Sequence, residues 1–185
     1  MRSKADEDKK FRELILYVGK LTEADPRCGS TKLNKVLFYA DFGAYRQLGR
    51  AISDQRYRKQ EYGPVPAGLV PVVAKMEKEG VCAWAERSYF GLPLRKLIPL
   101  REPDLSEFRA EELELVRSVI SDLWELNATE VSDLSHRFVG WQAAGMGEEI
   151  SYNSVFVGEP RPLSDEETEW ALDALREFRE RRRAS

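Results

Sequence analysis

Histidine and cysteine are scarce in this chain, whose 185 residues include one histidine and two cysteines. Zinc sites use closely spaced sets of these residues, whereas Cys28, Cys82 and His136 lie far apart in the sequence. We therefore expect no metal site. Two separated cysteines also fit a reducing compartment better than a disulfide scaffold, with a single Cys28–Cys82 bridge as the open alternative.

Long hydrophobic runs are also missing. No segment approaches the roughly 20 apolar residues that a membrane-spanning helix needs. The first residues, MRSKADEDKKFRE, are charged and are followed by no uninterrupted apolar run, which is unlike a signal peptide. These two absences predict a cytoplasmic protein.

Neither sign of charge is in clear excess. The chain has 29 lysine and arginine residues against 32 aspartate and glutamate residues, which gives a formal net charge of −3. Nucleic-acid-binding proteins usually present a basic face, so this balance does not favour them, although a local basic patch stays open. The C-terminal arginines suit the negative end of a helix and are better explained that way.

Motifs for catalysis or cofactor binding are absent. There is no glycine-rich phosphate loop and no nucleophile elbow around any serine. Ser135 and His136 are neighbours, but adjacent helical residues point about 100° apart and do not face each other. We expect no cofactor and no enzyme, and a hydrolase centred on His136 is the least favoured function. The preferred interpretation is a half-buried His136 that hydrogen-bonds the following loop, with Trp141 packed against it.

Apolar residues recur at helical spacing in several segments. We predict helices at about 9–24, 31–48, 66–80, 107–126 and 164–183, and a short one from Thr129 to His136. The 31–48 helix has too wide an apolar stripe for a surface helix, so it should be central. Ser30 or Thr31 is its predicted cap, and Gly49 its predicted stop.

Glycine, proline and alternating patterns predict the remaining structure. The 52–61 segment is a short strand or a connector, and Tyr62–Pro66 is a turn. Pro66 would start the next helix and Pro71 would then kink it. The 81–100 segment is a β-hairpin that turns near either Glu86–Ser88 or Gly91. Two later segments are predicted as a loop and as extended chain: 140–147 and 150–157.

Together these patterns predict an α+β fold that is mostly α-helical, namely a helical bundle with a small β-hairpin. We expect a single domain over 1–185, with its core at about 10–145 and a C-terminal extension. Three helices followed by a hairpin is the order of elements in a winged helix-turn-helix, which is an analogy of fold only.

Three stretches of the first half form a recognisable pattern: KLNKVLFYAD (32–41), GRAI (49–52) and YGPVP (62–66). A fourth, DLSHRFVGW (133–141), follows in the second half. Together they resemble the signature of the Panacea domain of the SocA-like antitoxins over about residues 10–145. That signature has a K-L-x-K-L-L-Y-x-A-D helix, a G-x-x-I-[ST] step, an aromatic-Gly-Pro-Val turn and a later L-S-x-x-S-H…W segment. Asn34, Phe38 and Pro71 depart from it.

The resemblance implies a bacterial or phage protein antitoxin of a type II toxin–antitoxin system. Members neutralise a toxin by binding it, and in the SocA case the antitoxin is an adaptor that delivers the toxin to a ClpXP-type protease. The partner would be the cognate toxin, whose identity the resemblance does not carry.

The same residues suggest where a partner would bind. The candidate partner-binding residues come from the shared motifs: Lys35, Tyr39, Tyr62, Gly63, Pro64, Pro66, His136 and Trp141. Maintenance of the fold is the alternative for each, since turn glycines and prolines usually serve the backbone. A second function, from another class, is a winged-helix nucleic-acid-binding regulator that uses the 66–80 helix and the hairpin residues Arg87, Arg95 and Lys96.

Overall fold

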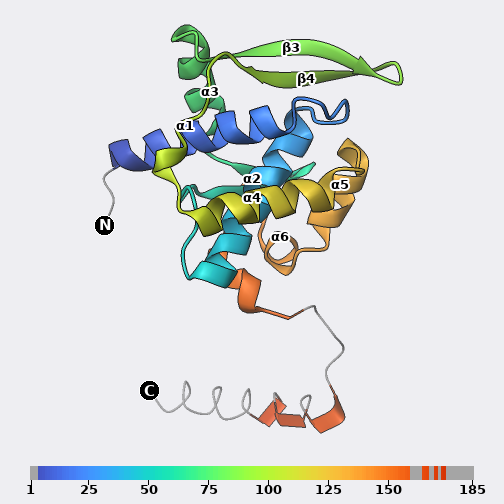
Figure 1. The fold of residues 1–185 in the computed structure, drawn as a ribbon. Coiled ribbons are helices and arrows are strands. Elements are labelled where there is room, and N and C mark those ends of the chain that lie inside the picture. Colours follow the sequence, from blue (N-terminus) through green and yellow to red (C-terminus); the bar gives the residue numbers. More distant parts are fainter. Residues whose placement is uncertain (1–3, 159–163, 167–168, 171, 174–185) are drawn as a thin grey trace.

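The computed structural model describes residues 4–158, 164–166, 169–170 and 172–173 (Figure 1). Within them the fold is α+β and mostly helical, as predicted. The helices are α1 (Lys4–Leu21), α2 (Ser30–Leu48), α3 (Leu69–Lys78), α4 (Ala110–Leu123), α5 (Ala128–His136) and α6 (Val139–Ala143). The strands are β1 (Tyr57–Gln60), β2 (Gly63–Pro66), β3 (Cys82–Tyr89), β4 (Leu92–Pro99) and β5 (Glu149–Ile150). Two 3-10 turns are η1 (Leu105–Glu107) and η2 (Tyr152–Phe156), and the predicted 164–183 helix falls largely outside the described residues.

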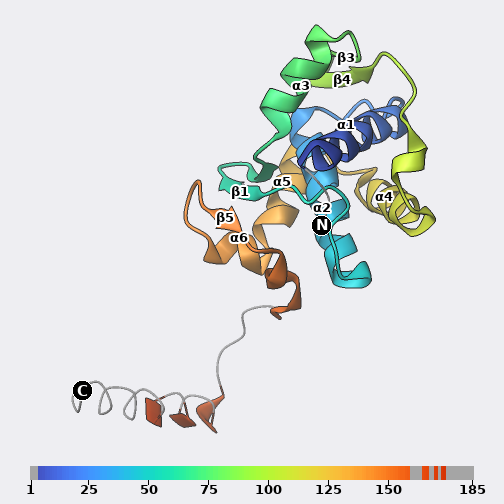
Figure 2. The same ribbon diagram turned by 90° about the vertical axis from the view of Figure 1, so that its left-hand side faces the viewer.

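Helix α2 is the central element of the fold. It packs against α1, α4 and α5, and also against β2, β4 and η2 (Figures 1 and 2). Gly49 ends the helix in the left-handed conformation at φ 73°, as predicted. The predicted serine or threonine cap is wrong, because the helix already includes Ser30 and its N-cap is Gly29, which has no side chain to accept a hydrogen bond.

The Tyr62–Pro66 segment is only partly a turn. Glu61 and Tyr62 form the turn, and Gly63–Pro66 is strand β2, which pairs antiparallel with β1. The sheet order is β2-β1-β5, so β2 lies at an edge. Proline has no N–H to donate to a neighbouring strand, and an edge strand tolerates this. The prediction of a continuous turn was wrong for that reason.

Helix α3 starts later than the sequence pattern suggested. Its first residue is Leu69 and its N-cap is Gly68, so Pro66 ends a strand and does not start the helix. Pro71 therefore lies in the first helical turn, where the backbone N–H would have no partner within the helix. The kink predicted at Pro71 assumed that the helix starts at Pro66. With the start at Leu69, Pro71 breaks no hydrogen bond within the helix and there is no reason for a kink.

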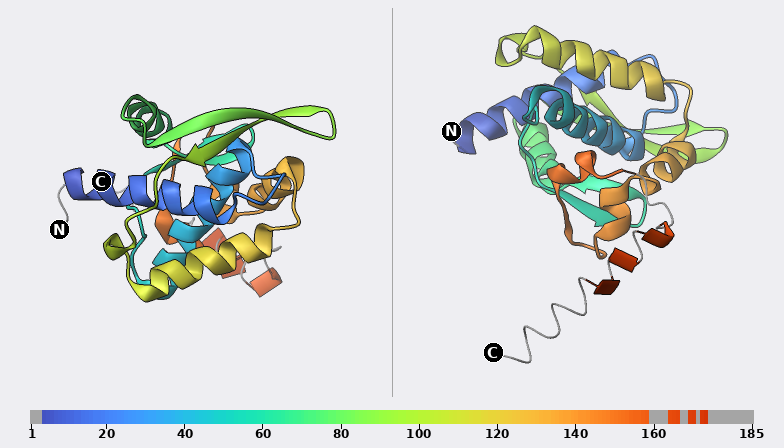
Figure 3. Two further views of the ribbon diagram at one scale, coloured as in Figure 1. Left: turned by 45° about the horizontal axis from the view of Figure 1, so that its top comes forward. Right: turned by 90° about the horizontal axis from the view of Figure 1, so that it is seen from below.

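Strands β3 and β4 form the predicted hairpin, and its turn is Phe90–Gly91 rather than Glu86–Ser88. Both turn residues have positive φ, 48° for Phe90 and 79° for Gly91. The hairpin follows α3 directly and its tip extends past the helical body (Figure 3). The order of three helices followed by a hairpin is present, as in a winged helix-turn-helix. Strands β1 and β2 are additional and lie between α2 and α3 in the chain.

Three predictions in the second half of the chain need correction. Asn127 caps α5 instead of Thr129, because the Asn127 side chain accepts hydrogen bonds from the amides of Thr129 and Glu130. The 140–147 segment is not only loop, since α6 occupies its first part. The 150–157 segment is mainly the 3-10 turn η2 rather than extended chain.

Two apolar clusters form the core. The main one joins α1, α2, α3, α4 and the base of the hairpin. The second is aromatic and lies between α2 and the β1-β2-β5 sheet, with Phe38, Phe42, Tyr57 and Ile150 at its centre. Cys28 and Cys82 are both buried and free, so they form no bridge. In the described part of the chain, none of the helices has the length and apolar character needed to cross a membrane.

Candidate partner-binding site

Lys32, the first residue of the longest motif, serves the fold. Its ammonium group is buried and lies 2.7 Å from an Asp25 carboxylate oxygen. It also donates to the backbone oxygens of Trp124 and Leu126, just after α4. A cation at a helix C-terminus satisfies carbonyls that have no partner within the helix. Lys32 therefore joins α2, the α1–α2 loop and the end of α4.

Asp41, the last residue of the same motif, is also structural. Its buried carboxylate accepts hydrogen bonds from the Ser53 amide, the Ser53 hydroxyl and the Tyr57 hydroxyl. Burial raises the pKa of Asp41 to about 6, although these donors act in the opposite direction. The motif aspartate thus fixes the segment after Gly49 against α2.

Lys35 differs from both. Its side chain is fully buried, but among the described residues it forms no ion pair, and its ammonium nitrogen has only the Pro64 carbonyl oxygen at 3.4 Å. Burial lowers the pKa of Lys35 to about 8. A buried cation without a carboxylate is unusual, since the cost of removing it from water is uncompensated.

Gly63 covers the Lys35 amine. It has φ 101°, and a Cβ there would lie 2.6 Å from Lys35 Cε and closer still to Ser135 Oγ. Ser132 on α5 donates to the Tyr62 carbonyl at 3.2 Å, and Ser135 donates to the Ser132 carbonyl. The structure therefore brings together three separate motifs: α2 through Lys35, the Tyr62–Gly63 segment, and α5.

His136 and Trp141 form a stacked pair, as the sequence suggested. Their ring centroids are 4.1 Å apart with an interplanar angle of 19°. The Lys59 ammonium lies 4.1 Å from the Trp141 ring centroid, and Trp141 Nε1 donates to the Gln60 carbonyl. Both aromatic residues are half-buried, as predicted for His136. His136 Nε2 is buried without a hydrogen-bond partner, so this nitrogen does not make the predicted hydrogen bond to the following loop. The pair attaches α5 and α6 to strand β1.

The remaining candidates differ in exposure. Pro64 and Pro66 are buried in β2, and Tyr39 is half-buried beside Phe38, where burial raises the pKa of its hydroxyl. Tyr62 is 65% exposed. Of the eight candidates, Tyr62 is the one whose side chain is largely open to a partner.

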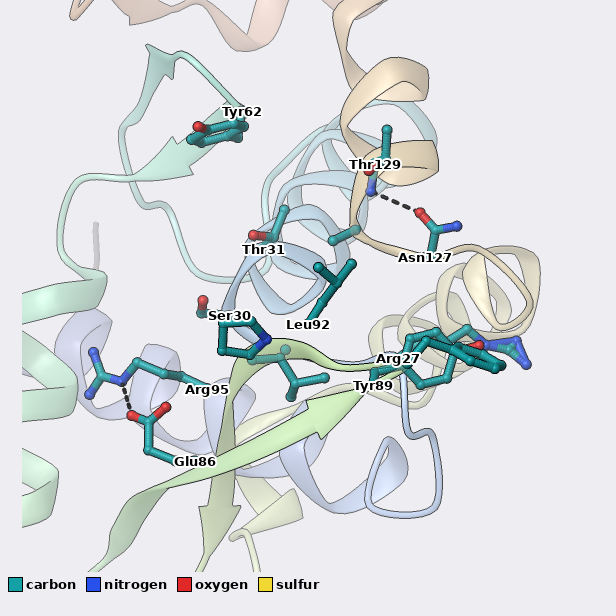
Figure 4. Close-up of a pocket in the computed structure, with 15 residues that line it drawn as sticks. Arg27, Ser30, Thr31, Tyr62, Glu86, Tyr89, Leu92, Arg95, Asn127 and Thr129 are labelled. Atoms are coloured by element: carbon teal, nitrogen blue, oxygen red, sulfur yellow. Dashed lines mark hydrogen bonds and ion pairs between the residues drawn. The ribbon is translucent and has the colours of Figure 1, made fainter.

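Tyr62 lines a cleft of about 1000 Å³ between the hairpin and the first turns of α2 and α5. Figure 4 shows Tyr62 and the hairpin on opposite sides of the Ser30–Thr31 turn. The walls of the cleft come from hairpin residues between Tyr89 and Arg95 and from Asn127–Thr129. Four segments that are distant in sequence meet here, so the cleft exists only in the folded chain.

The cleft has an apolar rim and a polar floor. Phe90 is 88% exposed and Leu92 is 70% exposed. The floor carries the backbone of Gly29, Ser30 and Thr31 at the start of α2, where no side chain caps the helix. A helix N-terminus has positive character and free amides.

Two arginines line the cleft, each beside a glutamate. Arg27 pairs with Glu125 at 2.9 Å. Arg95 pairs with Glu86 at 3.3 Å (Figure 4). The sequence analysis missed Phe90, Leu92 and Arg27 as site residues. The Phe90–Gly91 turn was the available signal for Phe90, since a bulky residue rarely occupies the left-handed region. No local signal could have indicated Arg27.

Metal binding finds no support among the described residues, where no cluster of histidine, cysteine, aspartate and glutamate is suited to an ion. Lys35 and Ser135 are close but both fully buried, which leaves a substrate no access to them.

Comparison with known proteins gives one match. The family model described as "Antitoxin SocA-like, Panacea domain" matches residues 33–142. This region runs from α2 to α6. It includes the buried cluster of Lys35, Gly63 and Ser135 and most of the cleft. No curated protein and no solved structure shows a significant match.

Proposed function

The chain belongs to the SocA-like antitoxin family with the Panacea domain, and from this we propose that it is the cytoplasmic protein antitoxin of a type II toxin–antitoxin system. It would act without catalysis, by binding its cognate toxin directly. The family match supports the antitoxin role in general.

We place the toxin contact at Tyr62 and the adjoining rim of the cleft. The observation that carries this is the position of Tyr62, which belongs to the shared YGPVP motif and yet is exposed, across the same cleft from Phe90 and Leu92. Exposed aromatic residues that line a concave surface are typical anchors of protein interfaces.

The other motif residues would then support this surface from beneath. Gly63, Pro64 and Pro66 shape β2, and Lys35 and Ser135 pack against Gly63. The His136–Trp141 pair holds α5 against β1, the strand that pairs with β2. These contacts fix where the backbone presents Tyr62.

Growth rescue and co-purification test the proposal. The neighbouring gene is expressed in a host with and without this protein, and the pair is then purified together. We expect toxicity alone, viability together and a stable complex. Tyr62→Ala and Phe90→Ser should each weaken the complex by about 30-fold or more, as loss of an interface anchor does. A matched control is Val70→Ser, on an exposed position of α3 outside the cleft, which should bind as the wild type does. A harmless or unbound neighbour contradicts the function.

Two modes of neutralisation give different readouts. Direct inhibition leaves the amount of toxin unchanged in the cell. Delivery to a ClpXP-type protease, as in the SocA case, shortens the half-life of the toxin only when both the antitoxin and the protease are present. A pulse-chase of the toxin in hosts with and without the protease separates the two modes.

A nucleic-acid-binding regulator is less well supported by the side chains. Lys96 is buried and donates to three backbone carbonyls, those of Thr22, Glu23 and Asp25. Arg95 lies beside Glu86, and the acidic Glu77 and Glu79 belong to α3 or its end. Phosphate contacts require unpaired cations and weaken steeply with salt. A mobility-shift titration at low salt should therefore give no complex.

A further inference from the structure

The two long edges of the β3–β4 hairpin have different surroundings. Strand β4 lies toward the body and packs against α1 and α2, whereas β3 lies on the outside and meets α3 near its start (Figure 1). Because the hairpin is a sheet of two strands, each strand has one edge without a further strand. Such edges bind additional strands unless the protein blocks them.

The pairing of the strands shows which backbone groups of β3 point outward. At the base of the hairpin the Leu100 amide donates to the Val81 carbonyl, so this pair is hydrogen-bonded. Bonded pairs alternate along an antiparallel ladder, and the amides and carbonyls of the even-numbered residues of β3 therefore point away from β4. Trp84 agrees with this, because its amide donates to the Glu77 carboxylate.

The edge of β4 is closed and the far half of β3 is open. Two of the outward positions of β4 are Pro93 and Pro99, which have no amide hydrogen to donate. On β3, Glu86 and Ser88 are exposed, and in the described part of the chain no acceptor faces their amides. The Glu86 carbonyl accepts a single exposed bond of 3.3 Å, from the side chain of its neighbour Arg87.

A second copy of the hairpin fits this edge poorly. Antiparallel pairing of β3 with itself about a twofold axis at Glu86 or at Arg87 would place like charges directly opposite each other, which is destabilising. An axis at Ser88 leads into the turn after one residue, and an axis at Ala85 requires the Trp84 amide, which is already bonded. The edge therefore favours a strand from a different chain.

Arg87 gives this edge a charge that the fold does not pair. Its side chain is exposed, and among the described residues it has no carboxylate partner. An opposite charge directly across two strands stabilises their pairing. The strand also continues into the cleft, which Tyr89 and Phe90 line, so a partner held at the rim is within reach of the edge.

We propose that an extended segment of the toxin adds to the hairpin as a third strand, antiparallel to β3, with a carboxylate side chain opposite Arg87. The segment exchanges backbone hydrogen bonds with Glu86 and Ser88, and the Arg87 guanidinium moves from the Glu86 carbonyl to the carboxylate. Strand addition of this kind takes its affinity from main-chain bonds. The inference rests on the antitoxin function proposed above and names the form in which the toxin is bound.

Amide hydrogen exchange of the full chain tests it, measured by NMR on the free protein and on its complex with the product of the neighbouring gene. In the free chain the Glu86 and Ser88 amides should exchange about tenfold or more faster than those of Ala85 and Arg87, which are bonded to β4. In the complex all four should exchange at similar slow rates.

Three results would overturn the third strand. The first is a stable complex in which Glu86 and Ser88 still exchange rapidly. The second is slow exchange of both amides in the free chain at every concentration, since the edge would then already be covered. The third is protection in the free chain that grows with its concentration, since a second copy would then be the occupant.

Variants of the edge give an independent measurement of toxin affinity. Ser88→Pro removes an outward amide and no bond to β4, so it should weaken binding by about tenfold or more. Ser88→Ala is the matched control, because it keeps the amide and should bind as the wild type does. Equal affinities of the two variants would contradict the main-chain contact. Thermal denaturation verifies that both are folded, and the exchange experiment on the wild type decides if Ser88→Pro is not.

Charge reversal tests the predicted carboxylate. Arg87→Glu should lower the affinity by about fivefold. Lys78→Glu is the control, since it makes the same change of charge at an exposed residue of α3 and should have no effect. Unchanged binding of Arg87→Glu would rule out the carboxylate opposite it. If no complex forms at all, the antitoxin function itself fails, whereas a complex without protection of the edge contradicts the third strand alone.

Discussion

Gly63 occupies a position that is closed to other residues for two independent reasons. Its φ of 101° is in a region that side chains rarely adopt, and a Cβ would collide with Lys35 and Ser135. This glycine is what permits the backbone of β2 to lie directly on α2 and α5. Its place in the shared motif therefore has a steric explanation.

Gly63→Ala should lower the free energy of unfolding by about 3 kcal/mol, because conformational strain and overpacking add. Gly147→Ala is the control: Gly147 also has positive φ, at 79°, but nothing lies within 4 Å of its would-be Cβ. That variant should lose only about 1 kcal/mol, from strain alone. Urea denaturation of both variants measures the difference, and equal losses would contradict the packing argument.

Lys35 makes a pH-dependent contribution to stability. Its pKa is lower in the folded chain, at about 8, than its ordinary value of 10.5, because burial disfavours the charged form. The unfolded chain therefore holds more protons than the folded chain between these values, and the folded state gains stability as pH rises through this window.

Lys35→Met removes this group. Between pH 7 and pH 10 the wild type should gain up to about 2 kcal/mol of unfolding free energy relative to the variant. Denaturation curves of both proteins at the two pH values measure that relative gain, so that other titrating groups cancel. A parallel pH dependence of the two proteins would contradict the lowered pKa.

At the scale of elements, the β3–β4 hairpin combines a strained turn with an exposed aromatic residue. Two-residue loops with positive φ at both positions favour asparagine followed by glycine, and here phenylalanine stands first. Within the fold, Phe90 contacts Tyr89 edge-on at 4.6 Å but stays almost wholly exposed. Strain that the fold does not use is typical of a binding residue.

Phe90→Asn should therefore stabilise the protein while it weakens binding. Asparagine tolerates the left-handed conformation, so we expect the unfolding free energy to rise by about 0.5–1 kcal/mol. Thermal denaturation measures the stability, and co-purification with the toxin measures the binding. A variant that is less stable than the wild type would mean that Phe90 serves the fold.

At the scale of the whole molecule, two buried lysines hold the bundle together at the ends of its helices. Lys32 bonds the carbonyls after α4, and Lys96 of β4 bonds those after α1. Asp25 is shared, since its carboxylate faces Lys32 and its carbonyl accepts from Lys96. This arrangement connects α1, α2, α4 and the hairpin, and thereby sets one wall of the cleft.

Lys32→Met should lower the unfolding free energy by about 3 kcal/mol or more, because it leaves the Asp25 carboxylate buried without its cation. Lys20→Met is a suitable comparison, since Lys20 pairs with Glu102 on the surface at 2.7 Å. Solvent screens exposed pairs of this kind, so this variant should unfold much as the wild type does. Equilibrium unfolding tests both, and a small loss for Lys32→Met would mean that the network is replaceable.

Periodicity and turn chemistry in the sequence determined the central helix, its stop at Gly49, the hairpin and the pairing of His136 with Trp141. These features depend on residues close together in the chain, so local patterns suffice to predict them. The predictions that Pro66 starts a helix and that Pro71 kinks it were wrong. Proline fits an edge strand at position 66, and it fits the first turn of a helix that starts three residues later, so both arrangements satisfy the same local preferences. Only pairing with β1 distinguishes them.

The tertiary structure alone decided which motif residues are exposed to solvent. Tyr62, Gly63 and Pro64 are consecutive in the chain, yet Gly63 and Pro64 are buried and Tyr62 is exposed. Burial depends on what covers a residue from elsewhere, here α5 over Gly63. The cleft likewise needs four distant segments to meet, so no local pattern could have shown that Tyr62, Phe90 and Arg27 share one surface.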